Sequence, residues 1–148
     1  MLLYILLLLV ALKKHNPLLN GGGMKLKDFI FLKQNNANNL LQTLNITITN
    51  SEAEQIFNKI QPHSLFFDDE KFYRLLCIDE ITNSNSEFLV DFTSYNLIPI
   101  IDCGDNDFIC YNYKKNMWCI FNIADETSFN ETTSILDYFN EVNYDWVN

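Results

Sequence analysis

The hydrophobic residues between positions 72 and 123 form short runs that are separated by Asn, Ser, Asp and Lys. The runs are rich in aromatic and β-branched residues, a composition typical of β-strands. They span 72–78, 88–92, 97–101, 108–113 and 117–123. Because the breaks at 103–107 and 114–116 are short enough for hairpins, the last three runs are predicted to form an antiparallel meander, with Trp118 or its neighbours packed under a helix.

Segments on either side of these runs show helical spacing. Residues 51–60 follow a Ser or Asn cap, begin with acids, carry apolar residues on one face and stop before Pro62. A closing helix is predicted at 132–142, a short helix at 40–44 and a short strand at 46–48. The fold class is therefore α+β: an antiparallel sheet, a meander in its C-terminal half, flanked by N-terminal helices and a closing C-terminal helix.

The N-terminus has a different character. Residues 1–12 are an aliphatic run, shorter than the roughly 20 apolar residues that span a bilayer and without the flanking features of a signal peptide. Three interpretations remain open for residues 1–23: an aliphatic leader or anchor, the product of a start assigned upstream of Met24, or a buried helix. Residues 24–148 are predicted to form a single domain that does not need residues 1–23. The protein is expected in the cytoplasm, away from membranes unless residues 1–12 act as an anchor.

The charge balance is strongly acidic. The 148 residues include 10 Lys and Arg against 19 Asp and Glu, a net charge of -9. Half of the basic residues lie in the first 33 positions, so the remainder is more acidic still. Affinity for nucleic acid comes largely from Lys and Arg that displace counterions, so direct binding of DNA or RNA is not expected.

Motifs for catalysis or metal binding are sparse. Cysteines occupy positions 77, 103, 110 and 119, without the C-x-x-C spacing of a zinc site. If residues 114 and 115 form a turn, Cys110 and Cys119 lie opposite each other, either as a disulfide or, as apolar strands favour, as buried thiols. His63 follows Pro62 in a loop signal, where a solvated or capping role is favoured over that of a general base. No cofactor or metal is expected.

Carboxylates gather at the ends of the predicted strands. Asp102, Asp105 and Asp107 lie within six residues, a density that suggests Ca²⁺ ligands, but the EF-hand spacing is missing. Asp, Asn and Gly are also the usual residues of hairpin turns, so a turn is favoured. Asp125 and Glu126 follow the strand predicted at 117–123. Together these acids form a negative rim that would attract and orient a basic partner.

The order of residue types from 97 to 142 carries a family resemblance. An aliphatic-Pro-aliphatic strand (97–101) leads to an acidic Gly turn (102–105), a Phe-Ile-Cys-Tyr strand (108–111), a Trp-bearing strand (118–121), an acidic loop (125–126) and a closing helix (134–139). This order resembles the C-terminal half of the SUKH superfamily, which joins fungal cell-wall-synthesis regulators to many bacterial immunity proteins. The resemblance covers roughly residues 70–142. Upstream, only Pro62 and the nearby aromatic residues stand in for the Leu-Pro, aromatic and Asn-Gly of the family.

The resemblance implies a non-enzymatic immunity-type protein that binds and neutralises a toxin, often a nuclease, by stoichiometric protein-protein contact. A toxin that binds nucleic acid tends to be basic, which fits the acidic rim. The predicted contact residues are Asp102, Asp105, Asp107, Asp125 and Glu126. Two alternatives stay open: a small hydrolase or transferase that uses His63 with an acid or Cys77, and a membrane-attached binding protein.

Overall fold

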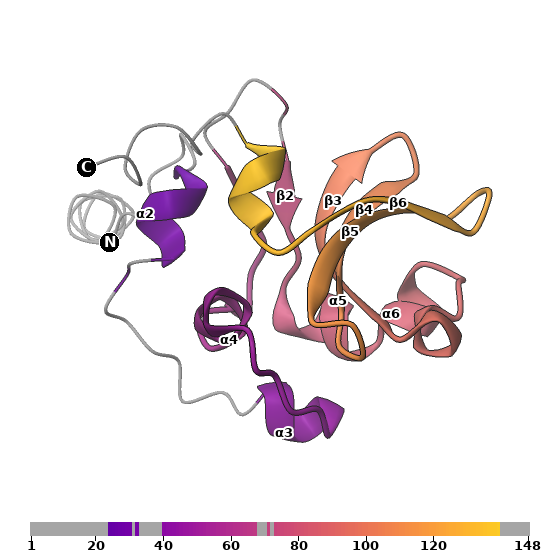
Figure 1. Cartoon of the computed structure of the whole chain (residues 1–148), viewed down its shortest axis with the longest axis horizontal. Helices are drawn as coiled ribbons and strands as arrows, with labels where there is room; N and C mark the ends of the chain where they lie inside the picture. Colours follow the sequence, from indigo (N-terminus) through magenta and orange to yellow (C-terminus); the bar gives the residue numbers. More distant parts are fainter. Residues whose placement is uncertain (1–23, 31, 33–39, 68–70, 72, 140–148) are drawn as a thin grey trace, which may run out of the picture.

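The computed structural model describes residues 24–139, apart from 31, 33–39, 68–70 and 72. The described α-helices are α2 (Leu26–Ile30), α3 (Leu40–Leu44), α4 (Ser51–Phe57), α5 (Ile78–Thr82) and α6 (Ser84–Glu87), and the 3₁₀ helices are η2 (Phe92–Tyr95) and η3 (Ile135–Tyr138). The strands are β1 (Leu65–Phe66), β2 (Arg74–Leu75), β3 (Leu97–Gly104), β4 (Asp107–Asn112), β5 (Met117–Asn122) and β6 (Thr127–Thr132). Figure 1 shows α2, α4 and η3 on one side of the molecule and the curved sheet of β3 to β6 on the other. The predictions for residues 1–23 and for 140–142 fall outside the described residues.

The strands form one sheet in which spatial order follows chain order, and each neighbouring pair is antiparallel. The predicted α+β class and the meander of β3, β4 and β5 are thereby confirmed. Cys110 pairs with Cys119 across β4 and β5, as the predicted turn requires. Both thiols are buried and free rather than bridged.

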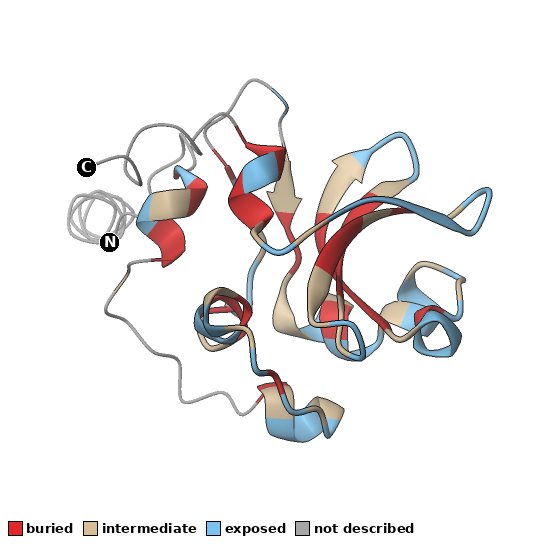
Figure 2. Cartoon of the chain, in the orientation of Figure 1, coloured by how far each residue is buried: buried red, intermediate tan, exposed pale blue. Residues whose placement is uncertain are grey.

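The core lies between the sheet and the helices on its inner side. Trp118 on β5 is fully buried and its ring centroid lies 5.0 Å from that of Tyr111 on β4. Tyr111 in turn meets Phe57 of α4 edge to face, with a centroid separation of 6.0 Å. The prediction that Trp118 or its neighbours pack under a helix is confirmed for Tyr111, the residue paired with Trp118. Figure 2 shows buried residues along β3 to β5 and on the inner faces of α2, α4 and η3, whereas β6 is exposed.

Helix α4 begins where the sequence predicted but ends earlier, at Phe57. Its cap is Asn50, whose Oδ1 accepts a hydrogen bond from the Ala53 N–H at 2.9 Å. Just beyond the helix, Lys59 is buried and its Nζ donates to the carbonyl of Ile30 at the end of α2. Burial lowers the pKa of Lys59, because the charged form loses hydration. This lysine therefore connects α2 to α4 through the interior.

The prediction of a strand over 72–78 is largely wrong. Strand β2 contains only Arg74 and Leu75, and helix α5 begins at Ile78. The physical reason is local: Glu80 accepts a hydrogen bond from the Cys77 N–H at 3.2 Å, and acids in a first helical turn are favoured by the helix dipole. Asp79 and Glu80 therefore start a helix instead of ending a strand.

Three other segments also differ from prediction. The run 88–92 is no strand: it follows α6 and leads into η2, with Phe88 and Phe92 directed at Phe108. Residues 46–48 form no regular element. Strand β6 was missed because its residues are mostly polar and exposed, and the predicted closing helix is the single 3₁₀ turn η3 within the described residues.

Candidate functional site

Four of the five predicted contact residues lie in two turns at the same end of the sheet. In a meander, the β3–β4 and β5–β6 turns share one end and the β4–β5 turn lies at the other. The first turn contains Asp105 with Asp107 directly after it, and the second contains Asp125 and Glu126. We call these two segments, residues 104–107 and 123–126, the acidic turns.

The acidic turns are joined to each other by hydrogen bonds. Strands β4 and β5 pair Asp107 with Asn122, whose Nδ2 donates to Asp107 Oδ1 at 2.8 Å. The backbone N–H of Ile123 donates to the carbonyl of Asn106 at 2.9 Å. The carboxylates of both turns are therefore presented from one connected backbone unit.

The β3–β4 turn has the backbone geometry of a tight hairpin. Asp105 and Asn106 have φ values of 51° and 66°, and Gly104 before them has φ of 79°. Two-residue hairpins of the common type need positive φ at both central residues, which Asn and Asp tolerate better than other non-glycine residues. The predicted turn is confirmed, and within the described ranges no group of three or more His, Cys, Asp or Glu side chains is placed to hold a metal ion.

The β5–β6 turn has the same hydrogen bonds as the β4–β5 turn but a different residue at its last position. In the β5–β6 turn, Asn122 Oδ1 accepts from the N–H groups of Ala124 and Asp125, both at 3.0 Å. The β4–β5 turn uses Asn112 in the same way. Each turn ends on a residue with φ of 53°, which is Asn116 in the first case and Glu126 in the second. Because Asn suits that conformation better, the local backbone does not explain the choice of Glu126.

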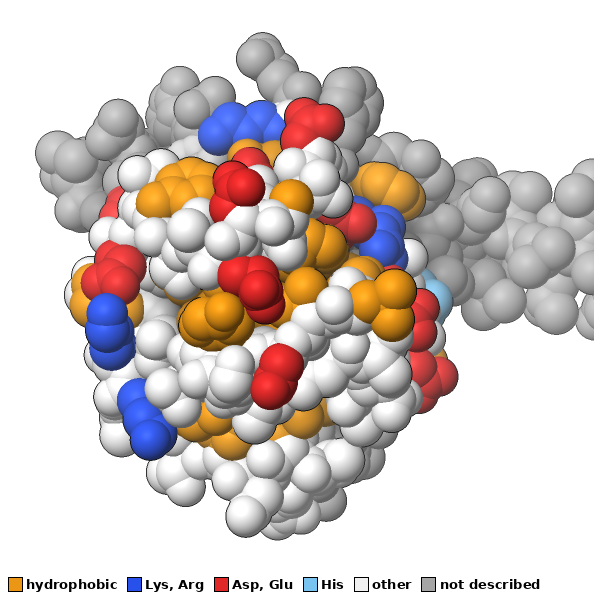
Figure 3. All heavy atoms as spheres, turned by 90° about the vertical axis from the view of Figure 1, so that its right-hand side faces the viewer, with side chains coloured by type: hydrophobic (Ala, Val, Ile, Leu, Met, Phe, Trp, Pro, Cys, Tyr) orange, Lys and Arg blue, Asp and Glu red, His pale blue; other side chains and the backbone are white. Residues whose placement is uncertain are grey.

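The two lysines of the β3–β6 meander lie at the other end of the sheet. After Arg74 the sequence contains two basic residues, Lys114 and Lys115, and both lie in the β4–β5 turn at the opposite end. Figure 3 views the side of the molecule that carries the tip of the β5–β6 hairpin, and shows acidic side chains across its centre with Lys and Arg side chains at its margins. A charge distribution of this kind attracts and orients cationic partners.

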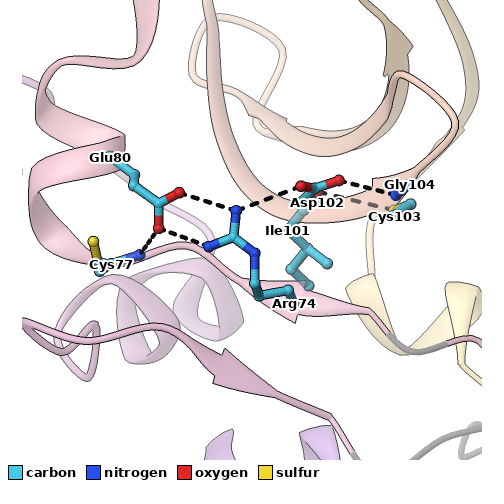
Figure 4. A network of polar contacts seen from close by, with 7 residues as sticks. All are labelled: Arg74, Cys77, Glu80, Ile101, Asp102, Cys103 and Gly104. Atoms are coloured by element: carbon cyan, nitrogen blue, oxygen red, sulfur yellow. Dashed lines mark hydrogen bonds and ion pairs between the residues drawn. The ribbon is translucent and has the colours of Figure 1, made fainter. Parts of the chain in front are cut away.

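The fifth predicted contact residue, Asp102, has an intramolecular role. Arg74 on β2 binds Glu80 of α5 through two hydrogen bonds of 2.8 and 3.0 Å, and its Nη2 lies 3.4 Å from Asp102 Oδ2. Asp102 Oδ1 accepts from the Gly104 N–H at 2.9 Å. Figure 4 shows the guanidinium between the two carboxylates, connecting β2, α5 and β3. Arg74 partly neutralises Asp102, so Asp102 contributes less to the negative surface than the exposed acids do.

Replacing Arg74 by Met is expected to lower the free energy of unfolding at pH 7 by about 1–2 kcal/mol. The side chains of Arg74 and Glu80 are 22% and 18% exposed, so solvent screens a pair that would contribute more in the interior. The matched control is Lys115→Met, which breaks the more exposed pair between Lys115 and Glu131 and should cost much less. Urea denaturation of the three proteins measures both losses.

The loss from Arg74→Met should shrink in acid. Burial acts to raise the pKa of Glu80, but the hydrogen bonds from Arg74 and from the Cys77 N–H outweigh it, so the pKa lies below its ordinary value of 4.5. A carboxyl group with a lowered folded-state pKa stabilises the fold above pH 4.5, and this contribution disappears as the pH falls through the folded-state pKa. The same denaturation series from pH 7 to pH 3 tests this, and a loss that stays constant with pH would contradict it.

The residues of the hydrolase alternative, His63 and Cys77, share no hydrogen bond in the described part of the chain. His63 is exposed in the bend after α4, and Cys77 precedes α5 with its N–H bound to Glu80. Burial raises the pKa of Cys103 to about 12 and of Cys119 to about 11, and it raises the pKa of Cys110 as well. These three thiols are protonated at neutral pH and are therefore weak nucleophiles.

A cleft with a volume of about 470 Å³ lies away from the acidic turns, beside the start of β3. Its lining includes Leu97, Ile98 and Tyr113, with the Thr, Asn and Ser side chains of residues 82–86. No charged side chain lines it among the described residues. Because its described lining residues are uncharged, the cleft would not attract a cationic partner by Coulomb forces. The cleft is therefore a feature separate from the acidic turns.

No protein-family model, curated protein or solved structure matches this chain. The likeness to the SUKH superfamily therefore stays a prediction based on the order of residue types between 97 and 142. None of the helices in the described ranges is long and apolar enough to cross a membrane.

Proposed function

We propose that this chain is an immunity-type protein that binds a cognate basic bacterial toxin in the cytoplasm and neutralises it by stoichiometric contact. The observation that carries the proposal is the pair of hydrogen-bonded acidic turns, with the two lysines of the β4–β5 turn held at the far end of the sheet. The resemblance to the SUKH superfamily supports the same function independently of this geometry.

The acids are arranged for recognition rather than for stability. Asp105, Asp125 and Glu126 are exposed, and like charges brought together on one surface repel each other and destabilise the fold. Glu126 also occupies a left-handed position for which the neighbouring turn uses Asn116. A basic partner compensates this repulsion on binding, and the attraction accelerates the encounter.

A nuclease is the class of toxin that this surface fits best. Enzymes that bind nucleic acid carry Lys and Arg where the phosphates lie. A rigid row of carboxylates can occupy that surface and compete with the phosphate backbone. Such inhibition requires no catalytic step by this chain. The four free cysteines agree with a reducing compartment such as the cytoplasm.

The proposal is tested with the protein encoded directly beside the gene for this chain. The two purified proteins should form a complex of fixed stoichiometry in analytical ultracentrifugation, and the toxic activity should fall in proportion to the added chain until that ratio is reached. The complex should weaken as salt is raised from 50 to 500 mM, because exposed charges are screened. Catalytic turnover of toxin or substrate that disappears with His63→Ala would instead support the hydrolase alternative.

A further inference from the structure

Leu89 is an outlier in both exposure and backbone conformation. Its side chain is 88% exposed, the highest value among the large hydrophobic residues that are exposed in the described ranges. Its φ is 56°, whereas the other described non-glycine residues with positive φ are Asn, Asp or Glu. A bulky residue with positive φ is strained, and an exposed leucine gains nothing from burial. Neither folding nor solubility accounts for leucine at this position.

The segment around Leu89 lies against the strand ends that carry the acidic turns. The ring of Phe88 is 4.8 Å from that of Phe108, which directly follows Asp107. The ring of Tyr95 is 5.1 Å from that of Phe121 at the end of β5, and Tyr95 is 38% exposed. The rings of Phe88 and Tyr95 therefore pack on residues that are close in sequence to the acidic turns. Figure 3 shows hydrophobic side chains between acidic ones on the face that carries the tip of the β5–β6 hairpin.

We infer that Leu89, with Tyr95 of the same segment, is the apolar anchor of the interface with the basic partner. This inference rests on the proposed function. Leu89 is flanked by the exposed acids Glu87 and Asp91, so the surface is an apolar contact surrounded by carboxylates. Its complement is a protein surface with a hydrophobic pocket surrounded by Lys and Arg. A second copy of this chain would bring two such acidic surfaces together, and charge repulsion opposes that arrangement.

The backbone that presents Leu89 is held in place. Asn85 Nδ2 donates to Asp91 Oδ1 and to Thr93 Oγ1, both at 3.1 Å, and Asn85 Oδ1 accepts from the Phe92 N–H at 2.9 Å. These bonds close the loop around Leu89 before any partner arrives. A preorganised apolar side chain loses little conformational entropy on binding, which is typical of residues that dominate interface energies.

The decisive variant is Leu89→Asn, because Asn suits positive φ and the chain already uses it at Asn96 with φ of 60°. The variant should unfold at the same or a higher temperature than the wild type. Its Kd for the purified product of the adjacent gene should rise at least about tenfold, chiefly through faster dissociation. The control is Phe66→Ser, which removes another exposed hydrophobic side chain, 55% exposed, from the edge strand β1. This strand lies at the other edge of the sheet from β6, so the control should leave Kd unchanged.

The outcomes separate this inference from the proposed function. If the wild type does not bind the adjacent gene product, the proposed function and this inference fail together. If the wild type binds and Leu89→Asn binds equally well, the anchor fails while the proposed function stands. A clear loss of thermal stability in Leu89→Asn would show that Leu89 is a structural residue, and a wild-type dimer abolished by the variant would assign the surface to a second copy. Either result overturns the inference.

Discussion

Trp118→Ala is expected to lower the free energy of unfolding by about 3–5 kcal/mol, the usual cost of removing a fully buried large aromatic side chain. Trp118 has no exposed surface and lies on β5, which is paired on both sides, with β4 and with β6. Its ring contacts Tyr111, and Tyr111 contacts Phe57 of α4. The cavity left by the substitution would therefore weaken the packing of the sheet against this helix. A loss of this size is a large part of the 5–15 kcal/mol that typically stabilises a domain.

Trp118→Phe is the matched control, and its cost should stay below about 1.5 kcal/mol. The indole N–H of Trp118 is buried without an acceptor among the described residues, so phenylalanine removes an unsatisfied donor while it keeps most of the ring volume. Urea denaturation followed by tryptophan-independent far-UV circular dichroism measures both variants. Equal losses in Ala and Phe would show that the indole nitrogen, rather than ring volume, determines the stability of this contact.

The sheet was predictable where apolar residues alternate with turn residues over a long enough stretch. Strands β3, β4 and β5 have five or more residues each and are bounded by Asp, Asn, Gly and Lys, so pattern and structure agree. Strand β2 has two residues, and it is followed by a helix start that is stabilised by the hydrogen bond from the Cys77 N–H to Glu80 and by two acids in the first turn. Strand β6 pairs only with β5 and faces solvent, so no apolar period marks it.

The acidic turns were predictable for a similar reason, whereas their apolar neighbour was not. Asp, Asn and Gly between two strands predict a hairpin, and a meander then places alternate hairpins at one end of the sheet. The contact of Arg74 with Asp102 depends on the pairing of β2 with β3, across residues far apart in sequence. Leu89 was predicted to lie in a strand, because an apolar run gives no sign that one of its members has positive φ and points to solvent.

Neutralising the four acids of the turns should slow association with the basic partner by roughly 10- to 100-fold at 50 mM salt. The substitutions are Asp105→Asn, Asp107→Asn, Asp125→Asn and Glu126→Gln. Amides keep the geometry of the turns: Asn tolerates the positive φ of residue 105, and an amide oxygen at 107 still accepts from Asn122. Asp102 is left intact because Arg74 requires it.

The difference in association rate between the two proteins should narrow as salt increases, since the Debye length falls from about 10 Å at 0.1 M to about 3 Å at 1 M. Stopped-flow kinetics against the adjacent gene product at several salt concentrations gives the association rate and its dependence on salt.

A comparison of two double variants supplies the control. Asp125→Asn with Glu126→Gln should slow association, whereas Asp28→Asn with Glu54→Gln, on α2 and α4 across the molecule, should change it little. The two pairs alter net charge equally, so equal effects would mean that total charge, and not the acidic turns, attracts the partner. In the acid variants, the dissociation rate should change far less than the association rate, because charges at the rim of an interface act mainly on the encounter. Leu89→Asn should show the opposite effect, because a buried apolar anchor acts mainly on the lifetime of the complex.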